Sequence, residues 1–171
     1  MAKLESEEEP ARQERVWFCP SAQPSLAGSL IFGVVKDTGE AQRVTFLERP
    51  VKVSEGTVLA FAGGQQRATD IFRFAAPCQQ KQCRNWSGHS CRVGERLVQI
   101  LPASSALPEC KLRSACLWFH QEGGSACLRC TQMVTNDPAM EIMLNTLESP
   151  EDESKGQKAF MVGAAVQHQE G

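Results

Sequence analysis

The sequence has no tyrosine, and aromatic residues make up only 6% of its 171 residues. Long apolar runs are also missing. The longest, such as Leu30 to Val35 and Val58 to Ala62, are far shorter than the roughly 20 residues that a membrane-spanning helix needs. Four of the first nine residues are glutamate, where a secretory signal has a basic segment followed by an apolar one. We therefore expect a cytoplasmic protein without a membrane segment.

Catalytic signatures are scarce as well. The chain holds only three histidines and contains no P-loop, no G-x-G-x-x-G and no G-x-S-x-G. General acid–base catalysis, which uses histidine most often, therefore has few candidate residues. This scarcity favours a protein that is not an enzyme, without deciding the question.

The net charge of −2 hides an uneven distribution of charge. Residues 1 to 15 hold five acids and three bases, and residues 137 to 171 hold seven acids and two bases. Residues 16 to 136 hold 8 acids and 13 bases, so a basic body lies between two acidic ends. We expect residues 1–15 and the tail within 136–171 to be flexible, because polar, charged segments have little apolar surface to bury.

Residues 16–66 have the composition of a small β-rich scaffold. β-branched and aromatic residues on both sides of a Lys36 to Glu40 turn predict a hairpin over residues 29 to 48. Pro50 to Val53 is a candidate for a further short edge strand. Ser54 is a candidate cap for a short helix through Phe61.

Residues 67–135 have the composition of a cysteine-rich region of short helices and loops. Helices are expected at 69–74, 95–100 and 113–121, and another after Asp137-Pro138 within the segment 136–171. Helices of two or three turns are unstable alone in water. We therefore predict an α+β protein whose second half is organised by bound metal, since metal-binding free energy becomes folding free energy.

Cysteine is the residue that the sequence has in excess, with eight in the chain and seven of them between Cys78 and Cys130. Thiols stay reduced in the cytoplasm, so metal ligation is favoured over disulfides. A redox dithiol at Cys127-Leu128-Arg129-Cys130, with Arg129 lowering a thiol pKa, is a weaker interpretation.

The last four cysteines, Cys110, Cys116, Cys127 and Cys130, are the predicted ligand set of one site. Structural zinc sites usually combine two closely spaced pairs, whereas an iron–sulfur cluster tolerates irregular spacing because its irons are separate corners. The spacing favours an iron–sulfur cluster. Zinc bound by Cys78, Cys83, Cys127 and Cys130 remains the alternative.

The earlier cysteines suggest a second site. Cys78, Cys83 and Cys91 supply three thiols and need a fourth ligand, for which Cys19 and His89 are both candidates. Cys19 follows an apolar pair, Trp17-Phe18, and is equally well interpreted as a buried structural thiol.

The segments Phe74 to Cys78 and Leu107 to Thr135 resemble a little-characterised cysteine-rich family associated with cyanobacterial genomes. The resemblance covers roughly residues 67 to 135 and implies a shared cysteine framework. It implies no activity.

Function follows from the metal prediction. Trp118 and Phe119 lie between predicted ligands and are expected to limit water access to a cluster, which tunes its potential. We therefore predict electron transfer or redox sensing with a protein partner. The alternative is a zinc-stabilised module that binds nucleic acid or protein, for which Trp86 and eight bases between residues 67 and 113 are candidates. An equally good interpretation is that these bases keep short helices solvated or balance the negative charge of metal-bound thiolates. The eight bases are Arg67, Arg73, Lys81, Arg84, Arg92, Arg96, Lys111 and Arg113.

Overall fold

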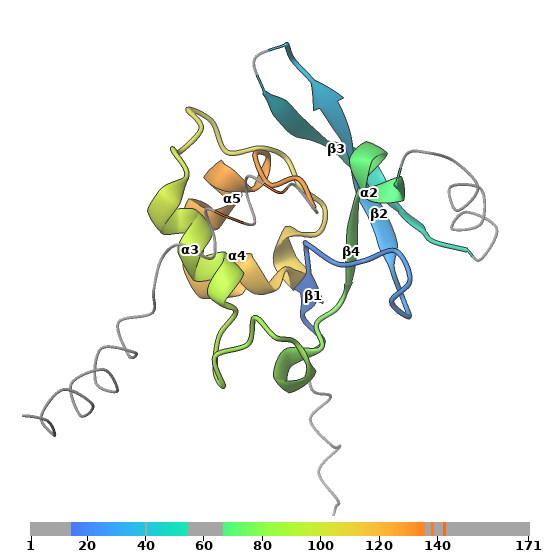
Figure 1. Ribbon diagram of the computed structural model, residues 1–171, viewed down its shortest axis with the longest axis vertical. Coiled ribbons are helices and arrows are strands. Elements are labelled where there is room, and N and C mark those ends of the chain that lie inside the picture. Colours follow the sequence, from blue (N-terminus) through green and yellow to red (C-terminus); the bar gives the residue numbers. More distant parts are fainter. Residues whose placement is uncertain (1–14, 40, 55–66, 136–137, 139–141, 143–171) are drawn as a thin grey trace, which may run out of the picture.

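The protein combines one antiparallel sheet with several short helices (Figure 1). The computed structural model describes residues 15–39, 41–54, 67–135, 138 and 142. The four strands lie in the order β1-β4-β2-β3. Their bounds are Phe18–Cys19 for β1, Leu30–Asp37 for β2, Gln42–Lys52 for β3 and Phe72–Pro77 for β4.

The predicted hairpin over residues 29 to 48 is confirmed, because β2 and β3 pair antiparallel. The turn is closed by Thr38, whose hydroxyl donates a 2.7 Å hydrogen bond to the Ala41 carbonyl. The short edge strand expected from Pro50 is instead the end of β3. It rejoins the ladder where Val51 faces Ile31, after an irregularity in the register.

The helix predicted over 69–74 is largely wrong. Helix α2 occupies only Ala68–Ile71, and the chain then enters β4, which lies between β1 and β2. Residues 73 to 76 are all buried, and such a strand has no polar face to reveal an alternating pattern. Because β4 comes from the cysteine-rich region, the sheet combines strands from both predicted regions, 16–66 and 67–135.

The remaining helices follow β4. They are η1 at Gln80–Gln82, α3 at Arg92–Ile100, η2 at Arg113–Ala115, α4 at Leu117–Glu122 and α5 at Gly124–Cys130. The helix expected at 95–100 lies within α3. The one expected at 113–121 is divided at Cys116 into η2 and α4. Helix α5 was not predicted. Gly123 separates it from α4 with a φ of 60°, a conformation that favours glycine.

Helices α3, α4 and α5 gather on one side of the sheet, and α2 lies against β2 and β4 (Figure 1). Phe32 of β2 and Ala75 of β4 belong to the core cluster that includes Leu97 and Trp118 from the helices. Gly94 lets α3 approach α4, since a Cβ there would lie 2.9 Å from the Trp118 ring. Neighbouring strand residues point to opposite faces, so Ile31 and Phe74 pack with Ala68 of α2.

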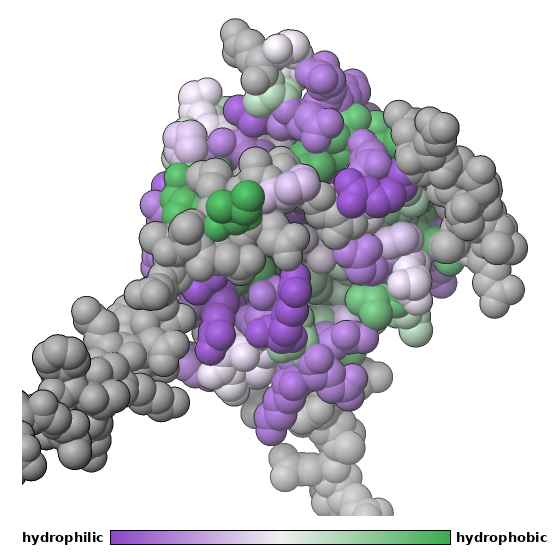
Figure 2. Space-filling model, viewed as in Figure 1, coloured by the Kyte–Doolittle hydropathy of each residue, from purple (hydrophilic) through white to green (hydrophobic). Residues whose placement is uncertain are grey.

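Some predicted segments fall mostly or wholly outside the described residues: the helix after Ser54, the helix after Asp137, of which the helical Pro138 and Ile142 are described, and the acidic ends at 1–14 and 143–171. No helix in the described part of the chain combines the length and the apolar character that crossing a membrane requires. On the face shown in Figure 2, hydrophilic side chains cover most of the described surface, and hydrophobic ones occur in small separate areas.

Candidate metal centre

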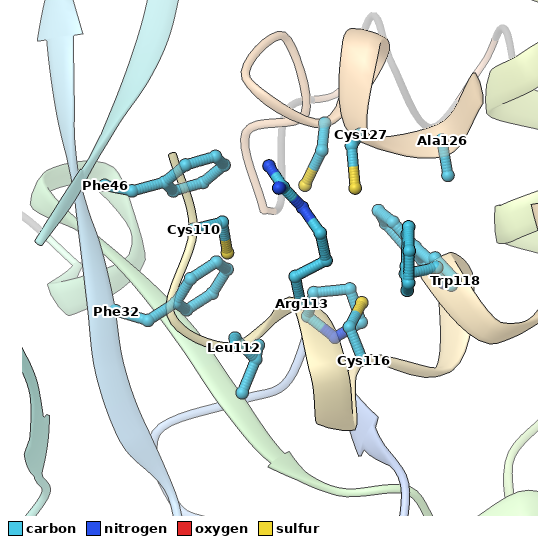
Figure 3. A pocket seen from close by; sticks show the side chains of 12 residues that line it. Phe32, Phe46, Cys110, Leu112, Arg113, Cys116, Trp118, Ala126 and Cys127 are labelled. Atoms are coloured by element: carbon cyan, nitrogen blue, oxygen red, sulfur yellow. The ribbon is translucent and has the colours of Figure 1, made fainter. Parts of the chain in front are cut away.

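Cys110, Cys116, Cys127 and Cys130 line one pocket between the sheet and the helices (Figure 3). Cys110 precedes η2, Cys116 joins η2 to α4, and α5 carries the other two. The spacing of three residues in α5 places Cys127 and Cys130 on one helix face. The structure therefore brings together the four thiols predicted to form one site. We call them the first thiol group.

The pocket is walled mainly by apolar and aromatic side chains and is partly open to solvent. Trp118 and Phe119 line it, as their position between the cysteines suggested. Phe32 of β2 and Phe46 of β3 form another wall, with ring centroids 5.5 Å apart and nearly parallel rings. Sequence reasoning missed these two residues, because the strands that carry them lie more than 60 positions before Cys110.

Backbone N–H groups are directed at sulfurs of the first thiol group. Burial raises the pKa of the Cys116 thiol to about 12, and hydrogen bonds from the N–H groups of Phe119 and Trp118 act in the opposite direction. Burial likewise raises the pKa of Cys110, and the Leu112 N–H opposes it. Such donors stabilise the anionic thiolate, which is the form that binds metal.

Arg113 enters the pocket from η2 and extends between Cys110 and Cys127 (Figure 3). Its Nη2 donates to the carbonyl oxygen of Pro108. Its buried Nε has no hydrogen-bond partner within the described ranges. A positive charge therefore lies among the thiols.

Cys19, Cys78, Cys83 and Cys91 form a second thiol group. Strand pairing sets Cys19 of β1 opposite Ala76 of β4, two residues before Cys78. The Cys78 backbone N–H donates a 2.8 Å hydrogen bond to Trp17, which anchors the chain just after β4. Cys83 follows η1, and Cys91 begins α3.

Charge interactions link Cys19 with Cys78 and Cys91, and they link Cys78 with Cys83 and Cys91. Burial raises the pKa of Cys19 to about 12, and the charges of Cys91 and Cys78 add to the increase. Burial also raises the pKa of Cys78, with further contributions from Cys91 and Cys83. Cys19 therefore lies beside this group, whereas His89 is exposed on the loop before α3.

Arg73 of β4 lies between the two thiol groups. Its side chain is completely buried, and its Nε donates a 2.6 Å hydrogen bond to the carbonyl oxygen of Pro20. Neither Nη1 nor Nη2 has a hydrogen-bond partner among the described residues. The guanidinium lies 5.8 Å from the centre of the Trp118 ring. Its pKa is lowered by burial and raised by three thiols, Cys130, Cys19 and Cys116, which come from both groups.

The sequence contained a signal for Arg73 that we did not single out. It is one charge inside the otherwise apolar run Phe72 to Ala76, and a charge in a buried strand requires a partner. The other bases of that region divide by exposure. Arg67, Lys81, Arg84, Arg92 and Lys111 are exposed, whereas Arg113 and Arg96 are partly buried. Trp86, considered for base stacking, packs against the core.

All eight cysteines are free thiols. The alternative zinc set draws one pair of ligands from each thiol group; Cys127 and Cys130 line the pocket, whereas Cys78 and Cys83 are not among its lining residues. Among the described residues, no three or more histidine, cysteine, aspartate or glutamate side chains are grouped so that they could hold a metal ion.

Comparisons with family models, with curated proteins and with solved structures give no match to this chain. The resemblance of residues 67 to 135 to a cysteine-rich family therefore remains a prediction.

Proposed function

We propose that the protein binds an iron–sulfur cluster in the pocket of the first thiol group and uses it for electron transfer or redox sensing with a protein partner. One observation carries the proposal. Four thiols from three segments of the chain, Cys110, Cys116, Cys127 and Cys130, line a single pocket that is otherwise largely apolar.

The arrangement of these thiols suits a cluster better than one ion. Four sulfurs around a single zinc converge to about 3.8 Å from one another, given zinc–sulfur bonds of about 2.3 Å. A cluster instead takes its thiolates at separate irons, so its ligands are spread around a cavity. In this pocket the thiols share the wall with Phe32, Phe46 and Trp118.

The residues around the sulfurs match the factors that set a cluster's potential. Hydrogen bonds to sulfur and exclusion of water both tune it. Backbone N–H groups point at Cys110 and Cys116, and Trp118 is only 1% exposed. A bound cluster would supply one-electron chemistry. The chain holds it, shields it from water and places positive charge nearby.

The test is the colour and metal content of protein purified without oxygen. Iron–thiolate clusters absorb visible light, whereas zinc, a d¹⁰ ion, does not. We expect brown protein with iron and acid-labile sulfide. Cys127→Ser should lose the visible absorption that arises from this site.

A matched control is Ser114→Ala. Ser114 is exposed and lies in the same stretch between two of the proposed ligands, so its variant should keep the colour. Colourless wild-type protein that contains zinc would overturn the proposal and favour the zinc-stabilised interaction module.

A further inference from the structure

The second thiol group has its own position in the fold. Cys19 is positioned by the pairing of β1 with β4. Cys78 directly follows the last residue of β4. Cys91 pairs with Trp86 through an isolated bridge, so the loop that carries Cys83 returns beside the start of α3. Strand pairing and this bridge thus bring together segments that carry the four thiols and lie up to 72 positions apart in the sequence.

Several donors around this group lack partners or point at sulfur. The Gln80 N–H donates to the Cys78 sulfur at 3.4 Å, and the Ser21 N–H is directed at Cys19. The buried indole N–H of Trp86 has no hydrogen-bond partner within the described ranges. Gln121 of α4 holds the Cys91 backbone, where its Oε1 accepts a 3.0 Å hydrogen bond.

Arg73 is an independent indication of an anion. A fully buried guanidinium with two unpartnered Nη groups is costly unless negative charge lies nearby. A metal cluster held by four thiolates carries net negative charge and hydrogen-bond-accepting sulfurs.

We propose that Cys19, Cys78, Cys83 and Cys91 form a second iron–sulfur site, with Cys19 as its fourth ligand, and that Arg73 is the positive charge shared by the two sites. The class of this second metal group rests on the proposed function of the first. Its location does not, because different residues form it.

The test reconstitutes the full chain without oxygen, using ferrous iron and sulfide, and counts iron and sulfide per chain. Cys19→Ser should hold about half of the wild-type iron, and Cys127→Ser should lose the other half. The double variant should hold almost none. His89→Gln is the matched control and should hold as much iron as the wild type.

Cys83→Ser is a second variant of the same site, and it distinguishes the loss of a ligand from misfolding caused by one substitution. Cys83 is only partly buried and lies on a different segment from Cys19, so an equal loss of iron in both variants identifies a shared site. Far-ultraviolet circular dichroism checks that each variant keeps its secondary structure.

The outcomes separate the two proposals. If Cys19→Ser and Cys83→Ser keep all the iron and Cys127→Ser loses it, the second site is wrong and the first stands. If the first two variants lose iron and Cys127→Ser does not, the first site is wrong and the second stands. Loss of iron in His89→Gln with none in Cys19→Ser would overturn the role of Cys19.

Discussion

Replacing Arg73 with methionine is expected to have opposite effects on the metal-free and the metal-loaded protein. Methionine is long, unbranched and adaptable, so it can occupy much of the space of the buried arginine stem. It removes the positive charge, the two unpartnered Nη groups and the hydrogen bond from Nε to Pro20.

In the metal-free protein the favourable and unfavourable changes partly cancel. Each unpartnered buried donor costs about 1–3 kcal/mol, so removing two is favourable. Loss of the charged hydrogen bond to Pro20 costs about 1.5–3 kcal/mol, and loss of the Trp118 contact up to about 2 kcal/mol. Removing a desolvated charge adds further stability. We expect Arg73→Met to leave metal-free stability unchanged or to raise it by up to about 4 kcal/mol.

In the loaded protein the same variant should weaken metal binding. Two unit charges on the order of 6 Å apart interact by about 3 kcal/mol at an effective dielectric constant of 20, which sets the scale for a charge beside a bound cluster. Loss of that interaction agrees with the 10–100-fold effect typical of residues that support metal ligands. The reduction potential should also fall by roughly 100 mV, since removing positive charge disfavours the added electron.

Two assays check these signs. Urea unfolding of chelator-treated protein, followed by circular dichroism, gives metal-free stability. The rate at which a chelator removes iron in the absence of oxygen measures how tightly the protein holds its metal. We expect faster iron loss from Arg73→Met than from the wild type. If chelation already unfolds the wild type, the predicted stabilisation appears as added circular dichroism signal in Arg73→Met.

Arg129→Met is the matched control, because Arg129 hydrogen-bonds the carbonyl oxygens of Leu101 at 2.7 Å and Ser125 at 3.0 Å. That variant loses satisfied hydrogen bonds and should destabilise the metal-free protein by about 1–3 kcal/mol. An equal destabilisation in Arg73→Met would show that Arg73 is satisfied within the protein, and it would refute the reasoning.

Two further predictions concern packing and pH. Gly94→Ala should lower the free energy of unfolding by about 1–3 kcal/mol, because the added Cβ would lie 2.9 Å from the ring of Trp118, which is 1% exposed. An unchanged Tm would contradict this close packing. The metal-free protein should lose stability as pH rises above 9, because burial raises the thiol pKa values from 9.0 to about 12 for Cys19 and Cys116 and about 11 for Cys130. The folded state thus favours the protonated thiols, so this stability is complete below pH 9 and declines toward pH 11. Urea midpoints between pH 7.5 and 10.5 measure it, and constant midpoints would show that these thiols are not buried.

Local sequence patterns were sufficient for several elements. The β2–β3 hairpin follows from apolar strand residues on both sides of a turn. The helix expected at 95–100 lies within α3, which presents Leu97 to the core. Cysteine spacing also grouped Cys110 with the pair at Cys127 and Cys130, because these positions are close in the chain and one short helix carries the pair.

Non-local pairing decided the rest. Strand β4 is buried along most of its length and shows no alternating pattern, so its place between β1 and β2 is what identifies it as a strand. That strand holds Cys19 of β1 near Cys78 and points Arg73 toward the helices. No local pattern encodes these positions, because each depends on strand pairing between residues at least 38 positions apart. The sequence by itself thus determined which residue types are available for metal chemistry, and the tertiary structure decided how they divide into two groups around one buried charge.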